Sequence, residues 1–420
     1  MKILDYLNVS NLSNLEADSG FIFQRQVIDE ILRQKPTWEV YFIAPKNPLP
    51  EEPRLHHIPL EYGQNKYEVR FNFPWFLLKE KLSRFLQDID LIYVNQSEQT
   101  ANFRALVSTI QPDREIPIVS YIHYFPIDPP HIHFDNSPNE YNHASNGEII
   151  KPKLRFDGTL NTHGLAKVIL SRQIEALQLS KQGLTCSQYG IDLIRNSIQK
   201  IMSDFTAPIA AISPPVSLKE AEVGKNIPKS NDNSIVFNHR LYSHYGPKEF
   251  FDFLDWYHAN RKKDFQVIIT DPTHGRSGER NRLDTSVDVT REQILTRKYV
   301  TLKHAESREE YYATIGRCKL AVAPFKPSAL WSMSVVDCMA AGTPVLAPNY
   351  ACFPEILGGE SRLLVKSRED LADKLDDLFE NPANYTEARE YCIMRANQFS
   401  AENTARRFVQ IFEKVCNPKK

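Results

Sequence analysis

Residues 327–349, with the sequence PSALWSMSVVDCMAAGTPVLAPN, place small polar side chains and a carboxylate at the start of an apolar helix. The first backbone N–H groups of a helix have no partner within it and carry partial positive charge, which suits a pyrophosphate. Ser332 and Ser334 are small enough to let phosphate oxygens approach, and the Asp337 carboxylate, one turn further, could accept hydrogen bonds from a ribose diol. The pattern predicts a site for a nucleotide-diphosphate sugar, formed by Ser332, Met333, Ser334, Asp337 and, after the next strand, Glu355.

The carboxylates of this segment also have structural explanations. Asp337 could be a solvated side chain near a helix N-terminus, where the helix dipole favours negative charge. Glu355 could cap a helix or form an ion pair. The small-residue run CMAAGTPV that follows Asp337 favours the ligand role for that residue. For Glu355, both explanations stay open.

Strand-length apolar runs alternate with helical patterns along most of the chain. This rhythm predicts parallel sheets with helices on both faces, whose ligands lie beyond the carboxyl ends of the strands. The alternation occurs twice and is interrupted by a polar linker before residue 234. We therefore expect an α/β protein with two Rossmann-like domains facing each other across a cleft. Residues 1–212 form the acceptor-side domain, residues 213–400 the nucleotide-sugar domain, and residues 401–420 a helix that packs back toward the first domain.

A segment rich in Pro, Asn, Asp and His interrupts the first alternation at residues 126–158. A long loop after a strand is a good candidate to line a site, and we expect it to contribute to the acceptor pocket. His131 and His133, with Asp128 and Asp135 nearby, could in principle ligate a metal ion. Because Pro-rich loops are commonly polar for solvation alone, we predict no metal site.

The composition is that of a globular protein and excludes a disordered chain. Of the 420 residues, 42% are hydrophobic and 25% charged, and the formal net charge is −1. This charge gives no global basic field for nucleic acid or anionic membrane. The six cysteines form no CxxC pair, and no apolar run is long enough to span a membrane. We therefore expect a cytoplasmic protein without an integral membrane segment.

The run from Ser332 to Leu357, SMSVVDCMAAGTPVLAPNYACFPEIL, resembles the donor-site block of retaining GT-B glycosyltransferases of the group 1, family 4-like type. That family has a Glu, seven residues, a second Glu, then Ala-Met-Ala-x-Gly-x-Pro-Val and a later Pro-Glu-Ile. Asp337 takes the place of the second Glu. The position of the first Glu, which lies close to the donor sugar in the family, is Ala329.

Weaker similarities to the same family extend from about residue 2 to 400. The segment IVFNHRLYSHYGPKEF resembles the strand and loop whose Arg and Lys neutralise the leaving diphosphate, which implies Arg240 and, less directly, Lys248. VSYIHYFP resembles a first-domain strand ending in a His near the reacting sugar, which implies His123. GLTCSQYG and ADSGFIFQRQ are similar to blocks that place Ser187 and Gly20 at the site. Structural alternatives are an ion pair for Arg240, an exposed helix-start Lys for Lys248 and a packed interior ring for His123.

The resemblance implies a hexosyl- or pentosyltransferase that retains the anomeric configuration. His123, Arg240 and Lys248 would be catalytic, with fixed positive charges in place of a metal ion and with no cofactor beyond the donor, for which a UDP-sugar is favoured. The acceptor could be a saccharide, a lipid, a protein or a hydroxymethylated DNA base. The DNA alternative depends on a basic stretch that includes Arg276, Arg280, Arg282 and Arg297. A GT-B-like protein that binds without turnover is the second alternative, and the oligomeric state stays open.

Overall fold

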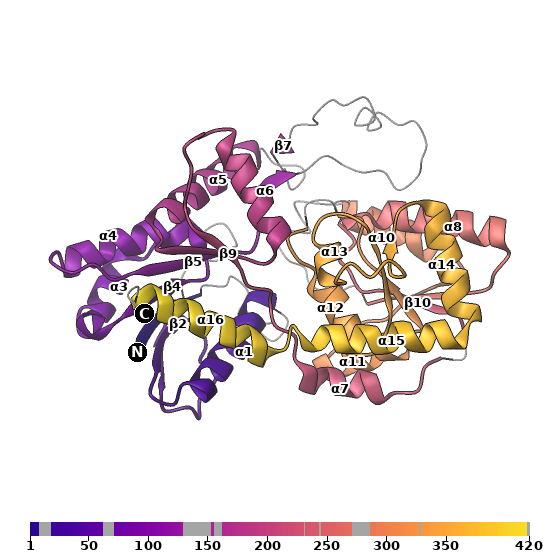
Figure 1. The fold of residues 1–420 in the computed structure, drawn as a ribbon, viewed down its shortest axis with the longest axis horizontal. Coiled ribbons are helices and arrows are strands. Elements are labelled where there is room, and N and C mark those ends of the chain that lie inside the picture. Colours follow the sequence, from indigo (N-terminus) through magenta and orange to yellow (C-terminus); the bar gives the residue numbers. More distant parts are fainter. Residues whose placement is uncertain are drawn as a thin grey trace. The chain divides into compact units, whose positions relative to one another are not determined.

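The computed structural model describes residues 1–7, 18–61, 71–128, 153–154, 162–230, 232–242, 245–270, 286–326 and 329–417. The chain divides into two compact units. The first contains Met1–Pro126, His163–Pro215 and Ala401–Lys420, and the second contains Ile127–Thr162 and Val216–Ser400. Each unit is built on a parallel sheet flanked by helices (Figure 1), as the alternating sequence pattern predicted.

The sheet of the first unit has the strand order β3-β2-β1-β4-β5-β8-β9, and all neighbouring strands are parallel. Its strands are β1 (Lys2–Tyr6), β2 (Glu39–Ala44), β3 (Leu55–Pro59), β4 (Leu91–Val94), β5 (Ile118–Ile122), β8 (Gln182–Thr185) and β9 (Ile209–Ala211). The helices are α1 (Ser19–Gln34), α3 (Trp75–Leu82), α4 (Thr100–Ile110), α5 (Thr162–Leu179), α6 (Gln188–Gln199) and α16 (Ala401–Cys416), with short 3-10 turns at Leu86–Asp88 and Ser97–Gln99.

Alternation along the strands gives this sheet two apolar faces, because successive side chains of a strand point to opposite sides. Leu4 and Tyr6 belong to a buried cluster with residues of α3 and α4, whereas Val40 and Phe42 belong to another cluster with residues of α1. Helix α16, drawn in yellow in Figure 1, packs beside α1. The ring of its Phe408 lies 5.4 Å from the ring of Tyr93 on β4, measured between centroids.

The sheet of the second unit has the order β12-β11-β10-β13-β14-β15, again with parallel neighbours. Its strands are β10 (Ser234–Phe237), β11 (Gln266–Ile269), β12 (Val300–Leu302), β13 (Leu320–Val322), β14 (Val345–Pro348) and β15 (Leu364–Val365). The helices are α7 (Leu218–Asn226), α8 (Pro247–Arg261), α10 (Ser286–Leu295), α11 (Arg308–Arg317), α12 (Met333–Ala340), α13 (Phe353–Ile356), α14 (Arg368–Glu380) and α15 (Pro382–Asn397). A two-residue pair, β6 (Ile127–Asp128) with β7 (Lys153–Leu154), is antiparallel.

Two glycines bring α7 and α11 into backbone contact. A Cβ atom added to Gly316 would lie 2.3 Å from the carbonyl oxygen of Gly224, a distance that no side chain tolerates. The contact fixes α11 against α7, and α11 carries several polar residues of the candidate site. The pattern-based reading missed α15, because Asn381-Pro382 reads as the end of a helix. In the structure Asn381 caps the next helix and Pro382 is its first residue.

No helix in the described part of the chain is both long enough and apolar enough to cross a bilayer.

Candidate functional site

The N-terminus of α12 lies beside the carboxyl end of β10, because Asn238 and His239, which follow this strand, both contact Ser334. Ser332 occupies the N-cap position, but its side chain does not cap the helix and instead contacts the Ser334 hydroxyl at 3.2 Å. Helices α6, α7, α11 and α14 differ, since in each a serine Oγ at the N-cap accepts from a first-turn amide. The first turn of α12 therefore keeps its amides free of side-chain caps, which is the arrangement that an anion needs.

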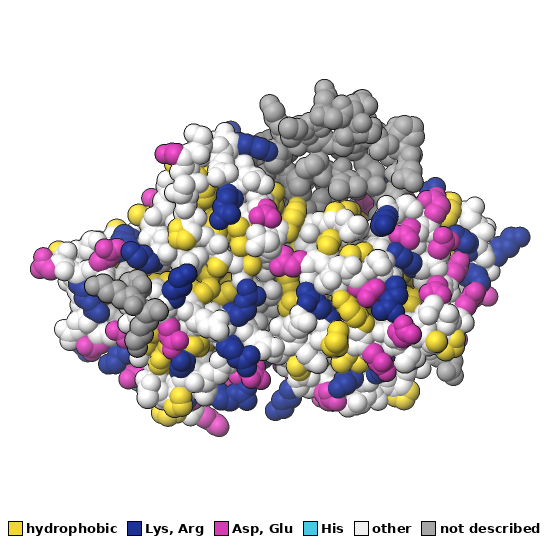
Figure 2. Space-filling model, viewed as in Figure 1, with side chains coloured by type: hydrophobic (Ala, Val, Ile, Leu, Met, Phe, Trp, Pro, Cys, Tyr) yellow, Lys and Arg dark blue, Asp and Glu magenta, His cyan; other side chains and the backbone are white. Residues whose placement is uncertain are grey.

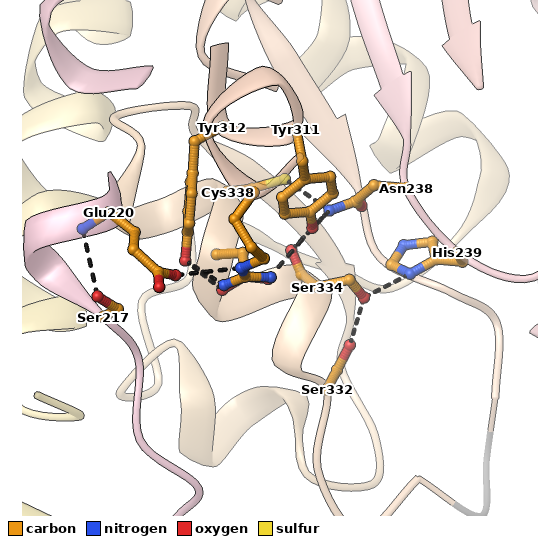
Figure 3. A network of polar contacts seen from close by, with 11 residues as sticks. Ser217, Glu220, Asn238, His239, Tyr311, Tyr312, Ser332, Ser334 and Cys338 are labelled. Atoms are coloured by element: carbon orange, nitrogen blue, oxygen red, sulfur yellow. Dashed lines mark hydrogen bonds and ion pairs between the residues drawn. The ribbon is translucent and has the colours of Figure 1, made fainter. Parts of the chain in front are cut away.

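His239 and Asn238, which follow β10, hold this first turn in place (Figure 3). The Nε2 of His239 lies 3.1 Å from the Val322 carbonyl and its Nδ1 lies 2.7 Å from the Ser334 hydroxyl. Because a carbonyl only accepts, Nε2 carries the proton and Nδ1 accepts from Ser334. Burial lowers the pKa of His239 to about 4, although the bond to Val322 opposes this shift. The ring is therefore neutral, and the Ser334 hydroxyl is oriented toward it.

Asn238 connects α12 to α11. Its side-chain amide donates to the Tyr311 hydroxyl at 2.9 Å and to the Ser334 carbonyl at 3.0 Å, and it contacts the Cys338 sulfur at 3.2 Å. Its Oδ1 is buried and has no hydrogen-bond partner among the described residues. An unpaired buried acceptor is costly, so this oxygen is a candidate contact for a hydroxyl or water at the end of β10.

Asp337, the central residue of the predicted site, is bound by other side chains of the protein. Its side chain is buried and accepts hydrogen bonds from the Tyr312 hydroxyl at 2.8 Å and the Tyr311 hydroxyl at 3.2 Å. The Arg308 guanidinium lies 3.7 Å from its carboxylate and 3.1 Å from that of Glu220. Burial raises the pKa of Asp337, while the Arg308 charge and the two hydroxyls oppose the shift.

Asp337 is thus the acceptor of a buried cluster that ties α12 to α11 and, through Glu220, to α7. The predicted contact of its carboxylate with a ribose diol stays a prediction. Such a contact would have to share the carboxylate with Tyr311 and Tyr312. One hint of the cluster is present in the sequence, because the segment SREEYYATIGRCKLAVAPF, which precedes the predicted donor block, contains Arg308, Tyr311 and Tyr312. No pattern indicates that these side chains meet Asp337.

Two cations follow the carboxyl ends of adjacent strands. Arg240 comes three residues after β10, is partly exposed and has no hydrogen bond or ion pair with any residue that the structure describes. Within the described ranges, no ion pair accounts for its position. Lys326 follows β13, the neighbour of β10, and its ammonium lies 4.5 Å from the ring centroid of Tyr245. The sequence-based interpretation did not select Lys326, because it occurs in no expected motif.

Lys248 is placed differently. It lies in the first turn of α8, its side chain is 80% exposed and it forms an ion pair with Asp252 one turn along the same helix. Such a pair is typical of a solvated helix face. Its role as a cation at the diphosphate stays a prediction. The ion pair with Asp252 accounts for Lys248 as a residue of the helix surface. Glu355 lies in the short helix α13 after β14 and is partly buried, and its role likewise stays a prediction.

In the first unit, the three predicted residues occupy different environments. His123 follows β5, is exposed and forms a hydrogen bond with Asn95. Ser187 is fully buried and caps α6 by accepting from the Gly190 amide at 2.9 Å, which explains it without a ligand. Gly20 lies in the first turn of α1 rather than in a loop, where an added Cβ would meet the capping Asp18 side chain at 3.2 Å.

The residues of the metal alternative, His131, His133 and Asp135, lie outside the described residues, as do Arg276, Arg280 and Arg282 of the basic stretch. Arg297 is described. Its guanidinium pairs with Asp255 at 2.7 Å and stacks on the Phe251 ring at 5.5 Å. It is therefore committed to the protein rather than presented to a nucleic acid. On the face shown in Figure 2, basic and acidic side chains are interspersed.

Comparisons with known proteins give a match to one family model and similarities to solved structures. Residues 219–399 match the model of the family "Glycosyl transferases group 1". Among solved structures, the chain is similar to sucrose-phosphate synthase from Thermosynechococcus elongatus, with TM-score 0.64, 15% identity and 99% of both chains covered. It is also similar to Anabaena Alr3699/HepE in complex with UDP-glucose, with TM-score 0.62, 14% identity and 99% and 100% covered. For the trehalose-6-phosphate synthase OtsA the TM-score is 0.67 at 11% identity, with 99% of both chains covered.

No curated protein sequence matches the chain. The structural likeness confirms the predicted fold class, two Rossmann-like α/β domains of the GT-B type. The family match covers the unit that contains α12, Asp337 and Arg240. Residues 219–399 thus match the family Glycosyl transferases group 1, and the chain has the GT-B fold of the solved structures.

Proposed function

We propose that this protein transfers a sugar from a nucleotide-diphosphate sugar to a hydroxyl acceptor, with retention of the anomeric configuration and without a metal ion. The family match and the two-domain fold support sugar transfer. A UDP-sugar is the favoured donor, because Alr3699/HepE is described in complex with UDP-glucose and an E. coli neighbour is described as bound with UDP-2-fluoro glucose.

The observation that carries the proposal is the first turn of α12, which has no side-chain cap and is contacted by the two residues that precede Arg240. Asn238 and His239 both contact α12, and Arg240 follows them directly as a cation without a partner among the described residues. The diphosphate would lie at the uncapped amides of the helix with Arg240 as its counter-charge. Positive charge placed where the diphosphate leaves stabilises the transition state more than the bound substrate.

Lys326 supplies the second positive charge in this proposal, in preference to Lys248. It follows the strand next to β10, and the Tyr245 ring restricts its side chain. Lys248 would first have to release Asp252. With fixed cations at the leaving group, the departing phosphate oxygen can take the proton of the acceptor hydroxyl, so that no metal ion and no separate base are required.

Isothermal titration calorimetry with UDP, GDP, ADP, CDP and TDP, each with Mg²⁺ and with EDTA, tests the donor site. One nucleotide should bind equally well under both conditions, and Arg240→Ala should weaken it. The matched control is Arg261→Ala, which removes a surface arginine paired with Asp373 on the same unit. With the corresponding sugar donor, NMR of the product or of the hydrolysed sugar should show the donor's anomeric configuration. Binding that depends on Mg²⁺, or an inverted product, would refute the corresponding part of the proposal.

A further inference from the structure

A chain of polar side chains runs through the apolar interior of the first unit and ends at His123. It begins at Asp5 on β1, passes through Gln24 on α1 and Asn95 after β4, and reaches His123 after β5. Asp5, Gln24 and Asn95 are each at most 2% exposed. Buried amides and carboxyls are costly unless they are hydrogen-bonded, so a continuous chain of this kind indicates a specific arrangement.

The hydrogen bonds of the chain are all donated in one direction, from His123 toward Asp5. The Gln24 amide nitrogen donates to Asp5 Oδ2, and the Asn95 amide nitrogen donates to Gln24 Oε1 at 2.6 Å. The remaining atom of the Asn95 amide is Oδ1, which accepts from His123 Nε2 and, at 3.4 Å, from the Tyr93 hydroxyl. An amide oxygen has no proton to give, so Nε2 of His123 must carry one.

The direction requires that Asp5 Oδ2 accepts the hydrogen bond from Gln24. Burial raises the pKa of Asp5, while the Gln24 side chain and the Tyr6 backbone oppose this shift. Oδ2 can accept from Gln24 in the carboxylate and also in the acid with its proton on Oδ1. The reverse chain would need a protonated Oδ2 as donor, and it would leave the Tyr93 hydroxyl facing an amide nitrogen.

Aromatic rings fix the plane of the His123 imidazole. The Tyr121 ring lies 4.3 Å from it at an interplanar angle of 36°, and the Phe23 ring meets it edge-on at 5.2 Å. Phe23 directly precedes Gln24 in α1, so a single helix turn contributes both the ring contact and the polar link. The imidazole is therefore constrained in tautomer and in orientation.

We propose that Gln24 and Asn95 are positioning residues that hold His123 in the Nε2–H tautomer, so that Nδ1 accepts a hydrogen bond from a hydroxyl of the reacting sugar. The part that concerns the sugar rests on the proposed function, whereas the tautomer does not. Asn95 and Gln24 act only through His123, because both are buried. The substrate class implied at this position is a hydroxyl donor, not an anion.

Long-range proton–nitrogen NMR of the full chain with nitrogen-15 histidine tests the tautomer directly. The His123 signals are assigned by their loss in His123→Gln. At mildly alkaline pH, we expect a protonated Nε2 and an unprotonated Nδ1 with little averaging between them. In Asn95→Leu and Gln24→Leu the two nitrogen shifts should move toward the averaged values of a free imidazole. The control Thr100→Val removes another buried hydrogen bond of the same unit, 2.7 Å long to Ser120, and should leave the His123 signals unchanged.

Activity provides a second readout. Asn95→Leu should lower kcat of sugar transfer by about 10-fold to 100-fold through misplacement of the ring, with the affinity for the free nucleotide unchanged. A wild-type His123 protonated at Nδ1, or an Asn95→Leu variant with unchanged signals and kcat, would overturn the inference. If Asn95→Leu does not fold, Asn95→Asp replaces it, because its carboxylate still accepts from Nε2–H. This variant should keep the wild-type tautomer of His123, and loss of that tautomer would equally overturn the inference. Failure of every donor to turn over would refute the proposed function while the tautomer remained measurable.

Discussion

Replacing Asp337 by alanine should destabilise the protein whether or not this residue touches a ligand. The carboxylate accepts from the hydroxyls of Tyr311 and Tyr312 and faces the Arg308 guanidinium in a buried environment. Removing one partner of such a cluster costs about 3 to 5 kcal/mol. Arg308 keeps its contact with Glu220, and the variant no longer has to bury the Asp337 charge, so a value near the lower limit is expected, about 3 kcal/mol.

Asp337→Asn should cost less, about 1 to 2 kcal/mol, because the amide oxygen still accepts from one tyrosine. Urea unfolding of the full chain, followed by far-ultraviolet circular dichroism, measures both variants. A loss below about 0.5 kcal/mol for Asp337→Ala would refute the argument, since that is the range of ordinary surface substitutions.

The same reasoning determines how nucleotide binding to these variants must be interpreted. Weaker binding by Asp337→Ala does not identify a ribose contact, because the variant also loosens α12 from α11. Tyr312→Phe provides the matched control, since it removes a hydroxyl from the cluster and leaves the carboxylate in place. If Asp337 reaches the ribose, Asp337→Asn should lose affinity for the nucleotide while Tyr312→Phe retains it. Equal loss in both variants would assign Asp337 to structural support.

Three further outcomes are expected. Lys326→Ala should lower the affinity for the nucleoside diphosphate by about tenfold, because it removes one charge-assisted contact. Lys248→Ala should change this affinity little, since Lys248 pairs with Asp252. Calorimetry compares the two variants, and the reverse order of their effects would refute the assignment. Gly316→Ala should destabilise the protein by about 1 to 3 kcal/mol in urea unfolding, because its Cβ meets the Gly224 carbonyl, and an unchanged midpoint would contradict that packing. His239 has its pKa lowered from 6.5 to about 4, so the unfolded chain takes up a proton first and stability should fall by up to about 3 kcal/mol between pH 6.5 and 4. His239→Gln should lose less stability over that interval, and equal pH profiles of unfolding would refute this.

Hydrophobic periodicity and the boundary signals of helices and strands determined the larger part of the fold. Apolar runs alternating with helical patterns predicted parallel sheets, and the segment around Asp337 predicted an apolar helix followed by a strand. The structure contains that helix as α12, and β14 follows it. The sequence pattern did not predict α15, because the pair Asn381-Pro382 can end one helix or begin another.

Only the tertiary structure decided which side chains meet. Arg308, Tyr311 and Tyr312 come 25 or more residues before Asp337 in the chain, and Asn95 comes 28 residues before His123. A one-dimensional pattern records the spacing of residues within an element but not the register between elements, which packing determines. The types and positions of Arg240, Asp337 and His123 could therefore be selected from the sequence. Three features follow only from the folded chain. Arg240 lacks a partner among the described residues, Asp337 is held by two hydroxyls and a guanidinium, and His123 is oriented by buried amides.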